Sequence, residues 1–264
     1  MTSPTPTGPA DAADAALARD LAAAAESTER LLRSVERMRP EQVLEPSALP
    51  GWTRGHVLSH IARNADGLGN LLLGARTSQP IPMYPSPESR ERGIQDGAKR
   101  TLAEHLADLH ASALRLTAAT EAMPDTAWAV EVPHRTGPFP AWAVPLKRIA
   151  EVEYHHVDLA HGYTPAQWPA AFVAQQLADL TTRFDGSADL PSMLLQASDT
   201  ELVLSTGRPV PADRRQVEFH LSGAAHDLLA WLSGRSDGGE LEVIVGCFEA
   251  GDPRSALPTL PPLG

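Results

Sequence analysis

The spacing of apolar side chains is helical in the first part of the chain and mixed after Gly162. We predict a first helix over 11–38, and the Pro-rich stretch 78–92 is expected to be a loop. The apolar positions that share one side of the first helix are Leu17, Leu21, Ala24 and Leu31. The same period predicts further helices over 53–73, which Thr53 would cap, over 94–122 and over 142–161. Four long helices joined by polar loops are typical of an antiparallel bundle, where sites form from side chains on facing helices.

After Gly162 helical and strand-like patterns alternate. We predict a helix near 170–184 and a second one that contains Leu228 and Leu232 and is closed by Gly234. The β-like runs are 201–205, 216–221 and 241–245. Strand, helix and strand in this order imply a small α/β domain, so the predicted fold class is α+β. The predicted organisation is a disordered tail over 1–10, a helical bundle over 11–165, a small α/β domain over 166–252 and a Pro-rich tail over 253–264.

Composition limits the possible partners. The formal net charge of the 264 residues is −11, which argues against a nucleic-acid partner. One cysteine, Cys247, excludes an internal disulfide and fits a reducing compartment. No apolar run is long enough to cross a membrane, and no signal-peptide pattern precedes the first helix. We expect a soluble, cytoplasmic protein without a membrane partner, and a monomer.

Two stretches place metal-ligand side chains at helical spacing. In the first, His60 lies at the edge of the buried stripe, whereas His56 turns toward the charged face, so His60 is the better candidate. In the second, Glu151, His155 and Asp158 share one face. Two histidines and one carboxylate suit zinc with an open fourth position, and Asp158 would orient a ligand histidine.

A simpler interpretation stays open. His60 would then be a satisfied histidine at the edge of the core, and Glu151–His155 a surface helix pair. One such pair alone favours this simpler interpretation. Two of them in one bundle make the metal site an equally good explanation.

Four segments resemble the mycothiol-dependent maleylpyruvate isomerase family. They are LPGWTRGHVLSHIARNADGL at 49–68, PMYPSPESRERGI at 82–94, RIAEVEYHHVDL at 148–159 and LSGAAHDLLAWLSGR at 221–235. The resemblance implies a DinB-like four-helix bundle followed by a sterol-carrier-like domain. It also implies that His60, Glu151 and His155 bind a divalent metal, most simply zinc, and that Arg235 faces the active site.

The same resemblance implies an isomerase that uses the thiol mycothiol as cofactor and a small molecule as substrate. A thiolate would add to the cis double bond of maleylpyruvate, the resulting single bond would rotate, and the thiolate would leave to give fumarylpyruvate. Cys247 lies in an apolar run and is expected to be a buried hydrophobe, so the nucleophile would be imported. Arg235 would hold a substrate carboxylate, and without the resemblance a solvated arginine that closes a helix is an equally good interpretation. Arg90 and Arg92 could touch the carboxylate or sugar hydroxyls of the thiol cofactor, but we expect them to be exposed.

Two rival functions share parts of this description. A mycothiol S-transferase acting on other electrophiles would keep the bundle and the metal and change only the substrate. A non-enzymatic metal- or lipid-binding protein would need an apolar cavity in 170–250. Charged Arg235 and Asp237 at the end of a predicted helix make a lipid tunnel less attractive.

Overall fold

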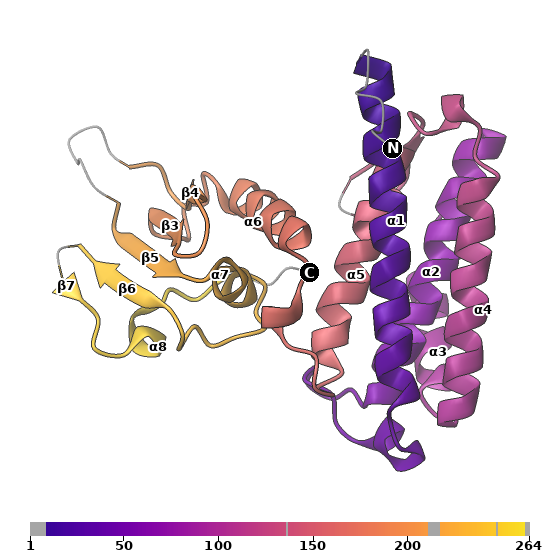
Figure 1. Cartoon of the computed structure of the whole chain (residues 1–264), viewed down its shortest axis with the longest axis horizontal. Helices are drawn as coiled ribbons and strands as arrows, with labels where there is room; N and C mark the ends of the chain where they lie inside the picture. Colours follow the sequence, from indigo (N-terminus) through magenta and orange to yellow (C-terminus); the bar gives the residue numbers. More distant parts are fainter. Residues whose placement is uncertain (1–8, 136, 211–216, 247, 262–264) are drawn as a thin grey trace, which may run out of the picture. The chain divides into compact units, whose positions relative to one another are not determined.

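The computed structural model describes residues 9–135, 137–210, 217–246 and 248–261. The chain forms two compact units, residues 1–163 and residues 164–264 (Figure 1). The first unit is mainly helical, and the second contains a sheet with helices. This combination confirms the predicted α+β class. Within the described ranges, no helix combines the length and the apolar character needed to cross a bilayer.

Four long helices of the first unit pack as a closed ring. Helix α2 packs against α4 and α5, and α1 packs against the same two helices. Buried aliphatic side chains such as Leu31, Ile61 and Val152 form the core between them. These four helices are α1 (Pro9–Glu36), α2 (Arg54–Thr77), α4 (Leu102–Glu121) and α5 (Val144–Asp158). Pro9 and Ala10, which we expected in a disordered tail, belong to α1.

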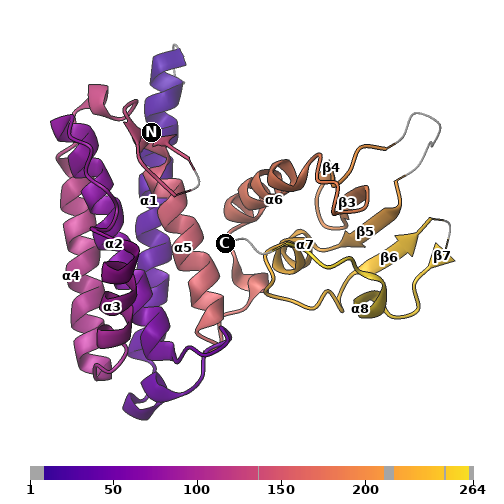
Figure 2. The same ribbon diagram turned by 180° about the vertical axis from the view of Figure 1, so that it is seen from behind.

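The prediction of a loop over 78–92 and one helix over 94–122 is wrong in part. Helix α3 (Pro87–Gly97) lies on α2 and ends before α4 begins (Figure 2). Ser86 starts α3, because its Oγ accepts a hydrogen bond from Ser89 N at 3.1 Å and Pro87 fits the first helical position. Thr101 and Glu104 start α4 with reciprocal hydrogen bonds between side chain and backbone. These start signals outweigh the helical period that runs through the break.

The remaining short elements of the first unit join the long helices. A two-stranded antiparallel sheet lies in the connection between α4 and α5. Its strands are β1 (Glu131–Val132) and β2 (Phe139–Pro140). The 3-10 turns are Pro40–Leu44, Asp125–Ala127 and Ala141–Ala143.

The second unit is built on a sheet with strand order β4-β3-β5-β6-β7, counted over the described residues. Strands β3 and β5 are parallel, and the other neighbours are antiparallel. Buried Leu195, Leu221 and Val243 share one face of the sheet, where α7 packs. The strands are β3 (Met193–Ala197), β4 (Val203–Thr206), β5 (Phe219–Gly223), β6 (Glu242–Val245) and β7 (Phe248–Glu249). The helices are α6 (Ala170–Phe184), α7 (Ala225–Leu232) and α8 (Pro253–Ala256), after the 3-10 turn Pro165–Gln167. Cys247, expected to be buried, lies outside the described residues.

Candidate metal centre

The three side chains predicted as metal ligands lie together in the first unit. His60 comes from α2, and Glu151 and His155 come from the neighbouring α5. His60 Nε2 lies 2.9 Å from His155 Nε2 and 3.0 Å from Glu151 Oε2. His155 Nε2 lies 3.5 Å from the same carboxylate oxygen. The predicted juxtaposition is therefore present, while the role of these residues as ligands stays a prediction.

The donor set fits one divalent ion. One ligand atom from each residue lies within 4.8 Å of the other two. Ligand atoms about 2.0–2.1 Å from a tetrahedral zinc ion are roughly 3.3–3.4 Å apart. Separations of 2.9–3.5 Å are close to that value. Nitrogen and carboxylate donors suit zinc and several other transition metals. The donor set is therefore compatible with a divalent ion and does not select one element.

His56 is used in a different way. Its Nδ1 accepts a hydrogen bond from Thr53 N at 3.2 Å, at the start of α2, and its Nε2 lies 3.1 Å from Gln95 Oε1. Both ring nitrogens are therefore occupied by the local structure. One turn later His60 is buried, with the Trp52 ring edge-on to it at 5.8 Å between centroids. His60, and not His56, therefore lies with Glu151 and His155, and its role as a ligand stays a prediction.

Asp158 orients His155. Its Oδ2 lies 2.8 Å from His155 Nδ1, and the carboxylate is buried. An ionised carboxylate only accepts hydrogen bonds, so the proton of the imidazole is held on Nδ1 and the lone pair on Nε2 points toward His60 and Glu151. This is the tautomer in which His155 Nε2 can bind a metal.

The pKa values of the cluster show how strongly its members interact. Burial opposes ionisation of Glu151, but hydrogen bonds and positive charge from His155 and His60 outweigh burial and hold the pKa of Glu151 well below its ordinary value. Burial lowers the pKa of His60. At His155 burial acts in the same direction, but hydrogen bonds to Asp158 and Glu151 outweigh it, and its pKa is raised. An ionised Glu151 and a neutral His60 are the forms that a metal requires.

Two buried arginines tie α2 to α5 on either side of the cluster. Arg54, the first residue of α2, donates from Nε to Leu159 O at 2.7 Å and from Nη2 to Ala160 O at 2.9 Å, just past the end of α5. Arg148 of α5 donates from Nη1 to Ile61 O at 2.9 Å and to Asn64 Oδ1 at 3.0 Å. Since His60 lies between these contacts along α2, they fix the register in which its ring meets α5.

A third group of side chains reaches the cluster from the segment 79–97, which follows α2 and lies back on it. A Cβ at Gly67 would be 2.7 Å from Met83 Cγ, and one at Gly74 would be 2.9 Å from Gln79 O. His60, Gly67 and Gly74 are spaced by seven residues and so lie on one face of α2. The two glycines leave the space in which the start of this segment lies.

This segment brings Arg90 and Tyr84 to the ligands. Arg90 Nη2 is 3.3 Å from His60 Nδ1, and its guanidinium lies 5.9 Å from the centre of the Tyr84 ring. Burial, followed by the charge of Glu151, raises the pKa of Tyr84 to about 12. Arg90 is half-buried, so its predicted exposure is wrong, whereas Arg92 is exposed as expected. The sequence signal for Arg90 was the loop-like segment 82–94 itself, but its contact with His60 depends on how that segment folds back.

Two other residues singled out in the sequence make local contacts within their own units. Arg235 belongs to the second unit and follows Gly234, whose φ of 74° closes α7. Its Nη1 donates to Ser233 O at 2.8 Å. His156 turns away from the ligands and stacks on Tyr163, with 3.7 Å between ring centres.

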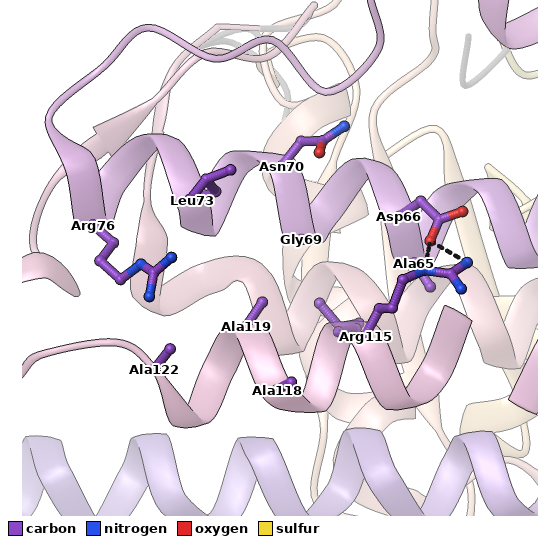
Figure 3. A pocket seen from close by; sticks show the side chains of 11 residues that line it. Ala65, Asp66, Gly69, Asn70, Leu73, Arg76, Arg115, Ala118, Ala119 and Ala122 are labelled. Atoms are coloured by element: carbon purple, nitrogen blue, oxygen red, sulfur yellow. Dashed lines mark hydrogen bonds and ion pairs between the residues drawn. The ribbon is translucent and has the colours of Figure 1, made fainter. Parts of the chain in front are cut away.

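A groove of about 520 Å³ lies between α2 and α4, and small side chains such as Ala119 form much of its wall (Figure 3). Two of the charged residues that line the groove pair with each other, since Arg115 Nε donates to Asp66 Oδ1 at 2.8 Å. None of the three predicted ligands lines it. Among its lining residues Asp66 supplies the one carboxylate and no histidine accompanies it, so the groove offers no set of metal ligands.

Comparisons with known proteins identify chains of similar fold. A crystal structure of the mycothiol-dependent maleylpyruvate isomerase superposes with a TM-score of 0.78 and 27% identity, over 90% of this chain and 95% of that one. A histidine-to-alanine mutant of that isomerase superposes with a TM-score of 0.77 and 26% identity, with the same coverage. No curated protein matches the chain.

The family described as the mycothiol maleylpyruvate isomerase N-terminal domain matches residues 24–160. That range covers more than half of the chain and includes His60, Glu151 and His155. The match confirms the resemblance seen in the sequence motifs. The chain therefore belongs to the mycothiol maleylpyruvate isomerase family and is an enzyme of that family.

Proposed function

We propose that this protein is a metal- and mycothiol-dependent isomerase that converts maleylpyruvate to fumarylpyruvate. The observation that carries the proposal is the cluster of His60, Glu151 and His155 in a chain whose fold matches an isomerase with that cofactor over nine-tenths of its length. The proposed metal ligands are these three residues, and zinc is the proposed ion. The proposed substrate anchor in the second unit is Arg235.

The chemistry that we propose for the metal ion is activation of the mycothiol thiol. When bound, a divalent ion with an open position would bind and deprotonate the thiol of mycothiol, and that thiolate is the nucleophile that isomerisation of a conjugated cis double bond needs.

The residues of the chain prepare the site for this reaction. His60, Glu151 and His155 would hold the ion, and Asp158 holds the proton of neutral His155 on Nδ1, so that the Nε2 lone pair would face the ion. The Trp52 ring packs against the ring of His60, with 5.8 Å between the ring centroids. Tyr84, with a pKa raised to about 12, stays protonated at neutral pH. Its hydroxyl can therefore donate a hydrogen bond to negative charge that develops on a substrate oxygen.

Metal analysis and activity assays of the full chain test the proposal. We expect one equivalent of zinc in the wild type and its loss in His60→Ala and His155→Ala. His110→Ala is the matched control, because His110 is exposed on α4. Undiminished zinc in both ligand variants would refute the site.

The same preparations test the role of the thiol. Turnover of maleylpyruvate should require added mycothiol and should survive Cys247→Ala, since the proposed nucleophile is imported. Loss of activity in a folded Cys247→Ala protein would refute an imported nucleophile. Turnover of chlorinated aromatics or epoxides with mycothiol, without turnover of maleylpyruvate, would establish the S-transferase alternative instead.

A further inference from the structure

Arg90 and Arg148, two arginines of the first unit with little exposed surface, form no ion pair with a described carboxylate. Among its described residues, the other arginines that are at least half-buried each pair with a carboxylate. Those arginines are Arg30, Arg54, Arg63 and Arg100. Arg90 and Arg148 make no ion pair within the described part of the chain, although acidic residues outnumber basic ones 33 to 22. Both lie beside the proposed metal ligands.

The two unpaired guanidinium groups differ in what they already contact. Arg148 is buried, and its Nη1 is bonded to α2 through Ile61 O and Asn64 Oδ1. Arg90 is half-buried, and its Nη2 donates a hydrogen bond to a ring nitrogen, His60 Nδ1, at 3.3 Å. A guanidinium has only donors, so this bond requires Nδ1 of His60 to carry no proton.

That requirement conflicts with metal binding by His60. A neutral imidazole that gives its Nε2 lone pair to a metal carries its proton on Nδ1. Two donors then face each other, and the Arg90–His60 hydrogen bond cannot persist. The guanidinium would be released while α3 still holds it at the edge of the cluster, seated over the Tyr84 ring.

We infer that Arg90 is the anchor for one carboxylate group of the substrate, and that metal binding at His60 frees it for this role. The inference rests on the proposed function. A carboxylate matches the planar donor pair of a guanidinium. The negative charge of a substrate carboxylate would also pair with the positive charge of Arg90, which forms no ion pair with a described residue of the protein. Maleylpyruvate carries a carboxylate at each end, and Arg90 would take one of them.

Binding of succinate to the cobalt-loaded full chain tests this assignment without turnover. Co(II) replaces zinc at histidine and carboxylate ligands and reports on the site through its visible absorption. Succinate is an unreactive dicarboxylate that serves as the probe. In Arg90→Gln we expect succinate affinity to fall roughly tenfold or more, because charge-assisted hydrogen bonds are lost. Arg92→Gln, an exposed change two residues further along α3, should bind succinate like the wild type.

Cobalt affinity without succinate gives a second readout. Arg90→Gln should bind Co(II) at least as tightly as the wild type, because the variant removes a competing hydrogen bond and a positive charge beside the ion. Unchanged succinate affinity in Arg90→Gln, with normal Co(II) uptake, would overturn the Arg90 assignment alone. Weaker Co(II) binding in that variant would overturn the proposed release. Failure of the wild type to take up Co(II) would refute the metal site, and this inference with it.

Discussion

Asp158 accepts a hydrogen bond from His155 Nδ1 at 2.8 Å, and its side chain is 2% exposed. Asparagine has the same shape but no charge, so Asp158→Asn should weaken the donor strength of His155. Loss of such a partner typically lowers metal affinity by about 10–100-fold. We expect a decrease in this range for zinc, measured by competition with a chromophoric chelator.

The matched control for this prediction is Asp96→Asn. Asp96 is exposed on α3, so this substitution removes one negative charge, as Asp158→Asn does, without removing the hydrogen bond to His155. Zinc affinity that falls equally in both variants would show an effect of net charge, and the orienting role of Asp158 would then be wrong.

At the level of residues, the sequence predicts what a single helix determines. The spacing of Glu151, His155 and Asp158 places them on one face of α5, and the structure shows them in contact. Arg90 could not be placed in this way. It lies 30 positions from His60, and their contact exists because α3 lies back on α2. No local spacing contains that information.

Glycines make the packing of α2 sensitive to single methyl groups. A Cβ at Gly55 would overlap the backbone oxygen of Ala98, which cannot move aside without moving the end of α3. We expect Gly55→Ala to destabilise the protein by about 1–3 kcal/mol, measured by urea unfolding.

Gly69, in the same helix, provides the control. A Cβ there would have Ala119 Cβ as its nearest neighbour, at 3.9 Å, which is an ordinary contact. Gly69→Ala should be neutral or stabilising by up to about 1 kcal/mol, because alanine favours the helix. Equal destabilisation by both substitutions would contradict the packing of α3 against the start of α2.

Buried His105 on α4 makes stability depend on pH. Burial, followed by the charge of Arg100, lowers the pKa of His105 to about 4 from an unperturbed value of 6.5. Below pH 6.5 the unfolded chain takes up a proton that the folded chain refuses, so this residue destabilises the fold progressively as the pH falls from about 6.5 to about 4. Urea midpoints at pH 5 and pH 7 should therefore differ less in His105→Gln than in the wild type.

His110→Gln is the comparison for His105, because His110 lies on the same helix but is exposed. It should leave the difference between the two pH values unchanged. An unchanged difference in His105→Gln would show that other groups dominate the acid sensitivity of the bundle.

Elements with a sustained period could be predicted, whereas one central strand of the sheet could not. The predicted helix 170–184 has the bounds observed for α6, Ala170–Phe184. Strand β3, Met193–Ala197, was not predicted, although it is paired on both sides. Met193, Leu194 and Leu195 form an unbroken apolar run without alternation, which a short sequence window cannot distinguish from part of a helix. Its parallel pairing with β5 joins segments more than twenty residues apart.

At the scale of the whole molecule, the proposed metal ligands and the proposed substrate anchor Arg235 belong to different units. His60, Glu151 and His155 lie in residues 1–163, and Arg235 lies in residues 164–264. Arg235→Ala should therefore keep zinc and fold. Loss of a charge-assisted contact to the substrate should lower kcat/KM by about 2–4 kcal/mol of transition-state stabilisation, roughly 30- to 1,000-fold.

Arg235→Lys separates charge from geometry in this prediction. Lysine keeps the charge but lacks the planar donor pair, so its kcat/KM should fall between those of the wild type and Arg235→Ala. Normal turnover of maleylpyruvate by Arg235→Ala would show that the second unit supplies no substrate anchor. The fold class followed from the sequence pattern at this scale, whereas the role of Arg235 stays a prediction.

The contacts of Arg54 and Arg148 also have a consequence for the cooperativity of unfolding. Arg54 joins the start of α2 to the end of α5, and Arg148 joins α5 to the carbonyl that follows His60 in sequence. The proposed ligand atoms of the two helices cannot separate by fraying of a helix end, since each path of separation breaks a buried guanidinium contact first. Amides around His60 and His155 should therefore exchange with solvent only in the global opening of the bundle. The site and the helical core would then be lost in a single thermodynamic step.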